Sequence, residues 1–370
     1  MSLEYQKLGD VADFIRGITY KPNDLVENFS EGSTVCMRTA NVQVQLKQDD
    51  LLSVPVNLVK NEDKFLTEGD ILVSTANSWN LVGKCCWIPK LEYSATAGGF
   101  ISILRANQEK LDQRYLYHWF NSPNTQLLAR NCGRQTTNIS NMDLERCLSI
   151  KIPLPPLAEQ RRIASILDQA DELRQKRQQA IEKLDQLLQA TFIDMFGDPV
   201  SNPKGWEVLK WGDALKIING KNQKAVLDQN GTFPICGSGG VMGYANEWLT
   251  PAQSVIIGRK GNINKPILMF ENFWNVDTAF GLVPNKDLLK VDYLFWFCHF
   301  FNFEQLNKTV TIPSLTKSDL LNIKIPIPPL EKQLYFSNIC DQTRKLKSKM
   351  ELKDLNLFSS LQNQAFSGTL

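Results

Sequence analysis

A chain of 370 residues is long enough for two or three domains, and its 43% apolar content can fill two ordinary hydrophobic cores. The net charge is only +2, which excludes a strongly basic protein, so any nucleic-acid surface must be a local concentration of charge. The sequence shows no signal peptide and no apolar run of membrane-spanning length. Its eight cysteines include no CxxC pair, so we expect reduced core thiols in a cytoplasmic protein.

The first segment, residues 1–152, predicts a globular α+β domain. Short apolar stretches bounded by Gly, Asn or Pro predict strands at 53–59, 69–75 and 98–104. An aromatic run, YLYHWF, follows Leu111 and predicts a helix. Polar residues gather in two places, STANSWNLVGK (74–84) and RNCGRQTTNIS (130–140).

The second segment, residues 153–197, predicts an extended arm and a long helix. The arm, IKIPLPPLAEQ (150–160), contains three prolines, and proline fixes its own φ and keeps the preceding residue out of the helical region. Apolar residues then recur at alternating spacings of three and four as far as Phe192. This pattern predicts an amphipathic helix over 157–196 with a face for another helix. The stretch GDPVSNPKGW (197–206) has no periodicity and predicts a connection.

The second half of the chain repeats the first. IKIPIPPLEKQ (323–333) matches the first arm, and a weaker apolar pattern follows it. Upstream, Tyr115 and Gly17 have counterparts in Tyr293 and Gly220. We therefore predict a second globular domain over 198–325, with strands at 254–260 and 279–284, and a second arm and helix over 326–370. Thr343, Lys353 and Ser360 fall at apolar positions of that second helix and weaken its pattern.

Catalytic motifs are absent from the sequence. There is no GxxxxGK[ST] phosphate loop, GxGxxG turn, GxSxG elbow, HExxH motif, zinc-deaminase motif or (N/D)PP(Y/F) tetrapeptide. GSGG at 237–240 lies among turn residues and predicts a bend. The two histidines, His118 and His299, lie within aromatic stretches, so we expect core packing and no metal site. The chain is predicted to catalyse nothing by itself.

The polar loops have side chains suited to reading DNA. Arginine can donate a bidentate pair to guanine, asparagine can pair with adenine, and lysine neutralises phosphate. The competing interpretation is that these loops are solvated turns; their matching places in the two halves, with different residues, favour recognition. The candidate DNA-binding residues are Thr75, Asn77, Ser78, Asn80, Lys84, Arg134, Gln135, Thr136, Asn138, Lys221, Arg259, Lys260, Asn262, Asn264 and Lys265.

The whole layout resembles the DNA-specificity subunit of type I restriction–modification systems. The resemblance rests on KIPLPPLAEQRRIASILDQADEL (151–173), its copy KIPIPPLEKQ (324–333), FPICGSGGVMGYANEW (233–248), and IIGRKGNINKP followed by NFWNVDTAF (256–280). It implies two globular target-recognition domains, each reading half of a bipartite site, joined and separated by two long antiparallel coiled-coil helices. STANSWNLVGK departs from the arginine-and-glycine form of 258–261.

The resemblance also implies partners. They are double-stranded DNA, two methyltransferase subunits and two ATP-driven motor-nuclease subunits, so S-adenosylmethionine, ATP and magnesium are expected there and no cofactor is expected in this chain. The main alternative is a non-enzymatic coiled-coil scaffold whose globular domains bind proteins, which the near-neutral charge favours. A third hypothesis is an enzyme in its own right, such as a fused nuclease. Salt-sensitive DNA binding separates the first two.

Overall fold

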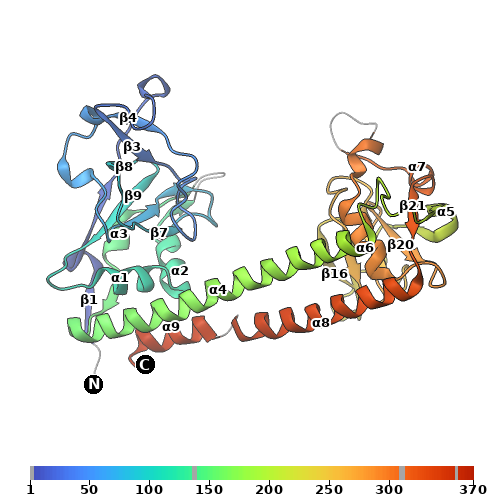
Figure 1. Ribbon diagram of the computed structural model, residues 1–370. Helices are drawn as coiled ribbons and strands as arrows, with labels where there is room; N and C mark the ends of the chain where they lie inside the picture. The colour runs from blue at the N-terminus through green and yellow to red at the C-terminus, as the bar shows by residue number, and fades with distance from the viewer. Residues whose placement is uncertain (1–3, 136–139, 308–312, 355–356) are drawn as a thin grey trace. The chain divides into compact units, whose positions relative to one another are not determined.

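The computed structural model describes residues 4–135, 140–307, 313–354 and 357–370 (Figure 1). It divides into two compact units, which we call unit 1 (Met1–Lys176 with Leu352–Leu370) and unit 2 (Arg177–Glu351). Both units mix helices and strands, as predicted. The division differs from the predicted segments because it assigns parts of the long helices to the units. The physical reason is that these helices contribute buried side chains to the two cores.

Unit 1 is built on an antiparallel four-stranded sheet in the order β2-β9-β5-β7. Its strands are β2 (Ala12–Arg16), β9 (Ile101–Ala106), β5 (Ile71–Ser74) and β7 (Cys85–Trp87). Two three-stranded sheets join β4 (Ser53–Pro55), β3 (Ser33–Met37) and β8 (Ala95–Ala97), and β10 (Arg134–Gln135), β11 (Ser140–Asn141) and β6 (Ala76–Asn77). The helices are α1 (Gln113–Phe120), α2 (Pro123–Asn131) and α3 (Leu144–Leu148), with 3-10 turns η1 (Leu8–Asp10), η2 (Pro22–Asp24), η3 (Val56–Leu58) and η4 (Glu62–Lys64).

Unit 2 has a sheet of the same connectivity, β14-β20-β17-β18. Its strands are β14 (Leu215–Asn219), β20 (Ala279–Pro284), β17 (Ser254–Gly258) and β18 (Ile267–Met269). A three-stranded sheet joins β16 (Gly240–Ala245), β15 (Phe233–Gly237) and β19 (Trp274–Asn275). The shorter helices are α5 (Trp211–Ala214), α6 (Val291–Phe300), η5 (Phe303–Leu306) and α7 (Lys317–Leu321).

Most predicted strands are present, with shifted ends. The strand predicted at 279–284 is β20, and those predicted at 69–75, 98–104 and 254–260 are shorter or displaced. The strand predicted at 53–59 ends at Pro55, because the chain continues into the 3-10 turn η3. The spacing of apolar residues there did not distinguish a strand from this tighter turn.

Both arms are extended, as their prolines predicted. The first forms β12 (Lys151–Pro153), which pairs with β1 (Tyr5–Lys7), and the second forms β21 (Lys324–Ile327), which pairs with β13 (Glu207–Lys210). Both pairs are antiparallel. Each arm is also bound by a buried tyrosine, since Tyr115 Oη donates to Pro153 O at 2.9 Å and Tyr293 Oη donates to Pro326 O at 2.9 Å.

The long helix α4 (Leu157–Phe196) has the predicted bounds. In unit 1 it packs with α9 (Leu357–Ser367), where the Arg174 guanidinium lies 5.5 Å from the Phe358 ring centroid. In unit 2 it packs with α8 (Leu330–Asp354), where Lys347 Nζ lies 2.8 Å from Asp185 Oδ1 and the rings of Phe192 and Phe336 are 5.6 Å apart. Within unit 2, residues later on α4 contact residues earlier on α8, so the pair is antiparallel.

All eight cysteines are buried free thiols, as predicted for core positions. His118 is also buried, but His299 is exposed on α6, so its predicted core position is wrong. The aromatic run that contains His299 is helical, and one side of that helix faces outward. In the part of the chain that the structure describes, no helix is both long and apolar enough to cross a membrane.

Candidate nucleic-acid interface

In unit 1, the two predicted polar loops are joined by strand pairing. The first loop leaves β5 and forms β6, and β6 pairs with β11, which follows the second loop. Asn77 lies opposite Ser140 in this pairing, and β11 pairs in turn with β10. Residues 76–77 of the first loop therefore meet residues 134–135 and 140–141 of the second in a small three-stranded sheet.

The candidate residues of segment 74–84 fall into two groups. Thr75, Asn77 and Lys84 are half-buried and have partners within the unit: Thr75 Oγ1 donates to Phe100 O at 3.2 Å, Asn77 Nδ2 to Ser74 Oγ at 3.2 Å, and Lys84 Nζ to Gln43 Oε1 at 2.5 Å. Ser78 and Asn80 are exposed. These two are the ones that the structure leaves accessible to a ligand.

The second loop of unit 1 is described only in part. Arg134 and Gln135 form β10, and their backbones lie opposite Asn141 and Ser140. Thr136 and Asn138 lie outside the described residues. The DNA-binding role of all four stays a prediction.

In unit 2, β17 ends at Gly258, and the chain turns sharply over the residues that follow, 259–265. A Cβ at Gly258 would lie 2.4 Å from Asn262 O, so only glycine fits there. The candidate side chains after it are exposed: Arg259, Lys260, Asn262, Asn264 and Lys265. The turn therefore places three cations together at the end of one strand.

Asn264 has an additional structural role. Its Oδ1 accepts from Phe303 N at 2.8 Å, and its Nδ2 donates to Asn302 Oδ1 at 3.1 Å. These bonds hold the start of η5 against the turn. The side-chain amide of Asn264, which the sequence suggested could pair with adenine, thus already makes two hydrogen bonds within unit 2.

Lys221 reaches the same end of unit 2 from β14. Its backbone N donates to Asn275 O at 3.0 Å, and its side chain is exposed. A Cβ at the preceding Gly220 would lie 1.8 Å from Val276 O, and one at Gly17 would lie 2.2 Å from Gly98 O. The glycine pair matched by sequence therefore serves the same close approach in both units.

Equivalent backbone hydrogen bonds show which residues correspond at this end of each unit. Thr75 N donates to Phe100 O at 3.0 Å, and Arg259 N donates to Thr278 O at 2.8 Å. Likewise Ile18 N donates to Ala97 O at 2.7 Å, as Lys221 N does to Asn275 O. Met142 N donates to Thr75 O at 2.8 Å, as Leu315 N does to Arg259 O at 2.9 Å. We call Ile18, Thr75 and Phe100 the first tip, and Lys221, Arg259 and Thr278 the second tip.

Sequence reasoning missed Phe100. The stretch GGFISIL predicted a strand from residue 98, which made Phe100 part of a half-buried sheet. In the structure β9 begins at Ile101, and the Phe100 side chain is 69% exposed. The signal that could have found it is the Gly98-Gly99 pair, which indicates a turn just before an aromatic residue.

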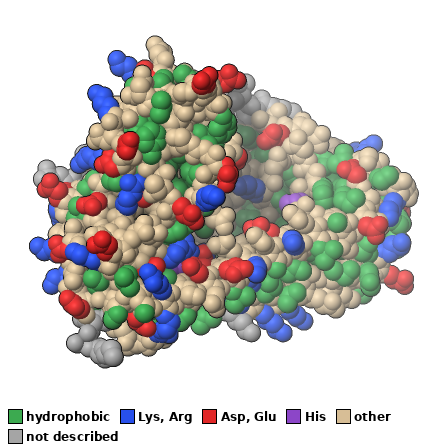
Figure 2. Space-filling model, turned by 60° about the vertical axis from the view of Figure 1, so that its left-hand side comes forward, with side chains coloured by type: hydrophobic (Ala, Val, Ile, Leu, Met, Phe, Trp, Pro, Cys, Tyr) green, Lys and Arg blue, Asp and Glu red, His purple; other side chains and the backbone are tan. Residues whose placement is uncertain are grey.

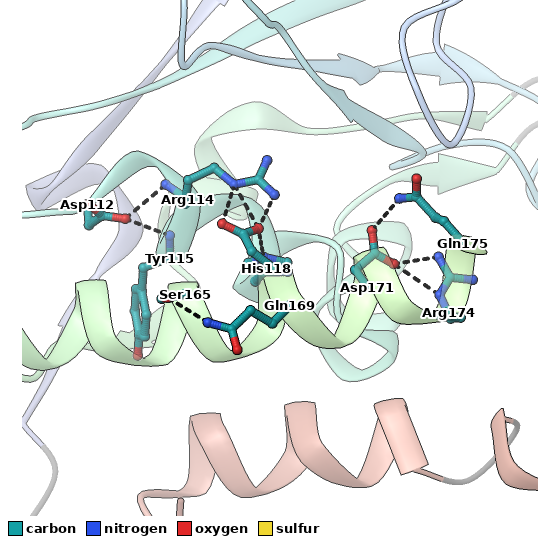
Figure 3. Close-up of polar contacts among 10 residues, drawn as sticks. Asp112, Arg114, Tyr115, His118, Ser165, Gln169, Asp171, Arg174 and Gln175 are labelled. Atoms are coloured by element: carbon teal, nitrogen blue, oxygen red, sulfur yellow. Dashed lines mark hydrogen bonds and ion pairs between the residues drawn. The ribbon is translucent and has the colours of Figure 1, made fainter. Parts of the chain in front are cut away.

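Away from the tips, charged side chains hold a short helix on a long one. In unit 1 the Arg114 side chain of α1 pairs with Asp168 of α4, and His118 Nε2 lies 2.7 Å from Asp168 Oδ1. Figure 3 shows the side chains of Arg114 and His118 close to each other beside α4. Burial raises the pKa of Asp168, but the hydrogen bonds from His118 and Arg114 outweigh it and lower that pKa to about 2. Asp168 is therefore a fixed anion near neutral pH.

Unit 2 has the same kind of contact with the charges exchanged. Tyr293 of α6 corresponds to Tyr115, so the neighbouring Asp292 takes the place of Arg114. Arg344 Nη1 of α8 lies 2.7 Å from Asp292 Oδ1, and its Nη2 lies 2.6 Å from Asp341 Oδ1. Elsewhere, the face drawn in Figure 2 shows basic and acidic side chains interspersed.

Comparisons with known proteins identify the family. The model described as type I restriction modification DNA specificity domain matches residues 2–183 and 203–353. A putative type I restriction enzyme MjaX specificity subunit from Methanocaldococcus jannaschii is 24% identical, over 89% of this chain and 84% of its own length. The EcoKI specificity subunit from Escherichia coli is 29% identical, over 43% of this chain and 34% of its own length.

Solved structures share the fold. The S subunit of a type I restriction–modification system from M. genitalium matches with a TM-score of 0.58 and 17% identity, covering 99% of this chain and 96% of that one. A second structure, from work on assembly and conformational transition of the type I R-M system, matches with a TM-score of 0.57 and 20% identity over the full length of both chains. The chain belongs to the family of type I restriction–modification DNA specificity domains, with one matched region beginning in each half of its sequence.

Proposed function

We propose that this chain is the DNA-binding specificity subunit of a type I restriction–modification complex, and that each unit reads one half of a bipartite DNA site. The observation that carries the proposal is the pair of tips. Both units hold the tip residues with the same backbone hydrogen bonds, yet the side chains differ. A common frame with different side chains is what two different half-sites require.

The second tip and the turn beside it have the chemistry of a DNA surface. Lys221, Arg259, Lys260 and Lys265 are all exposed, in a chain whose net charge is only +2. Lysines there would neutralise phosphates and release counterions, and Arg259 could donate two hydrogen bonds to guanine in the major groove. The first tip offers mainly neutral groups, with Ser78 and Asn80 nearby.

The long helices are proposed to set the spacer between the half-sites. Helix α4 has 40 residues, which corresponds to about 60 Å of helix, and one turn of B-DNA is about 34 Å. Insertion of one heptad into α4 and the matching heptad into α8 should lengthen each helix by about 10 Å. The spacer of the recognised site should then change while both half-sites stay the same. An unchanged spacer would contradict this role of the helices.

The chemistry of modification and cleavage is proposed to belong to partner subunits. These are two adenine methyltransferase subunits, which would use S-adenosylmethionine, and two motor-nuclease subunits, which would use ATP and magnesium. This chain would hold no cofactor and would dock the methyltransferase subunits through its helices. Support comes from the related structure whose subject is complex assembly of a type I system.

Methylome sequencing tests the proposal directly. Cells that express the chain with its methyltransferase partner should methylate a two-part motif, and loss of the chain should abolish that methylation. Exchange of residues 206–322 for the corresponding unit of a related protein should replace one half of the motif and keep the other. Absence of any chain-dependent motif would contradict the proposal.

A non-enzymatic scaffold that binds proteins is the other function to separate, because the net charge is close to zero. DNA binding by the complex should weaken steeply with salt if several phosphates are contacted. Binding that is absent, or insensitive to salt, would favour the scaffold.

A further inference from the structure

We propose that the first tip reads its half-site through Phe100, whose ring contacts the 5-methyl group of a thymine in the DNA. This inference rests on the proposed function and adds a specificity-determining residue to it. It concerns unit 1, where the sequence offered no arginine at the position of Arg259.

The backbone holds Phe100 rigidly. Its carbonyl oxygen accepts from Thr75 N at 3.0 Å, from Ala76 N at 3.2 Å and from Thr75 Oγ1 at 3.2 Å. The preceding turn is closed by Ile101 N, which donates to Gly98 O at 3.0 Å. The side chain is nevertheless 69% exposed. A single exposed aromatic is common on proteins, but this one is held by the backbone of the first polar loop, where Ser78 and Asn80 are also exposed, so it is positioned for contact.

The surroundings of Phe100 are mostly apolar. It borders a hollow of about 560 Å³ whose apolar walls include Ile18, Tyr20 and Leu25. Arg38 also lines this hollow, but its Nη2 lies 2.9 Å from Asp50 Oδ2, so its charge is balanced. Such a surface attracts a methyl group more readily than a phosphate.

The second tip gives the contrast that defines the chemistry. Where the first tip has Ile18, Thr75 and Phe100, the second has Lys221, Arg259 and Thr278. The largest side chain of the first tip, Phe100, therefore lies just before β9, whereas that of the second tip, Arg259, lies just after β17. Arginine recognises guanine through hydrogen bonds, whereas a phenylalanine ring has no hydrogen-bonding group. At a base edge in the major groove its apolar partner is the thymine methyl group.

Deoxyuridine substitution tests this contact, because it removes the methyl group and keeps the base pairing. The first half-site is the half of the motif that stays unchanged when residues 206–322 are exchanged. Binding of the full chain, in complex with its methyltransferase partner, is measured on duplexes in which each thymine of either half-site is replaced singly. We expect one replacement in the first half-site to weaken binding about four-fold, the value of one buried methyl group.

Matched variants assign the effect to the ring. Phe100→Ala should bind the thymine duplex more weakly and no longer distinguish thymine from deoxyuridine at that position, while Phe100→Leu should keep part of the preference. Thr278→Ala, at the equivalent place in unit 2, should leave the preference intact. Thermal unfolding of each variant checks that the fold is retained, which we expect because the ring is exposed.

Three results would overturn the inference: a first half-site made only of G·C pairs, a wild-type complex indifferent to every replacement there, or a Phe100→Ala complex that keeps the preference. Each of these requires a complex that binds its bipartite motif. A complex without sequence-dependent binding would instead contradict the proposed function, so the two failures are distinguishable.

Discussion

The two units keep the same neutral hydrogen bonds in their cores, whereas the charged contacts beside them are exchanged. Gln160 of α4 accepts from Asp112 N at 2.8 Å and donates to Lys110 O at 3.0 Å and Pro155 O at 2.8 Å. Gln333 of α8 repeats all three bonds, with Lys290 N, Leu288 O and Pro328 O. In unit 1 the short helix carries the cation of the ion pair, Arg114, and the long helix carries Asp168. In unit 2 the long helix carries the cation, Arg344, and the short helix carries Asp292.

This difference has a physical explanation. A buried glutamine that satisfies three backbone groups has no substitute, because any other side chain leaves at least one of those groups unpaired. An ion pair keeps its attraction when both signs are exchanged.

The largest expected effect comes from removal of Arg344. Asp292 is only 4% exposed, so Arg344→Ala leaves a buried carboxylate without this ion pair and should lower the free energy of unfolding by about 3–5 kcal/mol. Arg114→Ala should cost about 1 kcal/mol, because Asp168 is partly exposed and keeps His118. Chemical denaturation of the full chain measures both.

The exchanged double variant is the control. Arg344→Asp combined with Asp292→Arg should recover much of the stability that either single change loses, as expected for a pair that acts by attraction. If Arg344→Ala and Arg114→Ala lowered the free energy of unfolding equally, burial of the carboxylate would not explain the difference expected between the two contacts.

The tips should differ in how they respond to truncation. Arg259→Ala should reduce discrimination at one base pair of the second half-site by about 1–3 kcal/mol, because a bidentate contact is lost. Lys265→Ala should weaken binding to every sequence and lower the dependence on salt. Thr75→Ala, at the equivalent place in unit 1, should change discrimination by less than about 1 kcal/mol, because its hydroxyl is bonded to Phe100 O. Binding to a panel of single-base variants at two salt concentrations measures these effects. Identical profiles for Arg259→Ala and Lys265→Ala would contradict base reading by Arg259.

The sequence predicted features that depend on long periodic or proline-rich stretches. Helix α4 was predicted at its observed ends because its apolar spacing runs over many turns after two adjacent prolines. The arms were predicted because proline restricts the chain locally. The duplication was predictable because matched residues such as Gly17 and Gly220 meet the same steric demand in both units.

The site was less predictable because it depends on tertiary contacts. Strands β6 and β11 have two residues each, too short for any periodic signal, yet they join the two polar loops of unit 1. Asn264 has the composition of a base-reading residue, and only the fold shows that it holds η5. His299 lies in an aromatic helix, but an apolar composition does not tell which side of that helix faces outward. The exposure of Phe100 was not predicted, because the stretch GGFISIL is compatible both with a strand from residue 98 and with a turn before Ile101.

A smaller effect should separate Asn264 from its neighbour Asn262. Asn264→Ala should lower the free energy of unfolding by about 0.5–1.5 kcal/mol, because the Phe303 N–H loses its acceptor, and should leave base discrimination nearly unchanged. Asn262→Ala should do the reverse, since that side chain is exposed. Denaturation and the same binding panel measure the two variants. A loss of discrimination in Asn264→Ala without a loss of stability would restore its base-reading role.

The smallest expected effect is a pH dependence confined to unit 1. Burial raises the pKa of Asp168, but its contacts with His118 and Arg114 outweigh burial and lower that pKa to about 2. An unfolded aspartate titrates near about 3.9. The charged form of Asp168 therefore stabilises the fold above about pH 4. That contribution should disappear as the pH falls towards about 2, where the folded state also becomes protonated. It should amount to less than about 1 kcal/mol, since the carboxylate is partly exposed and screened. Asp168→Asn should therefore differ most from the wild type near neutral pH and approach it in acid. A difference that stays constant over this range would mean that the contact acts by packing and not by charge.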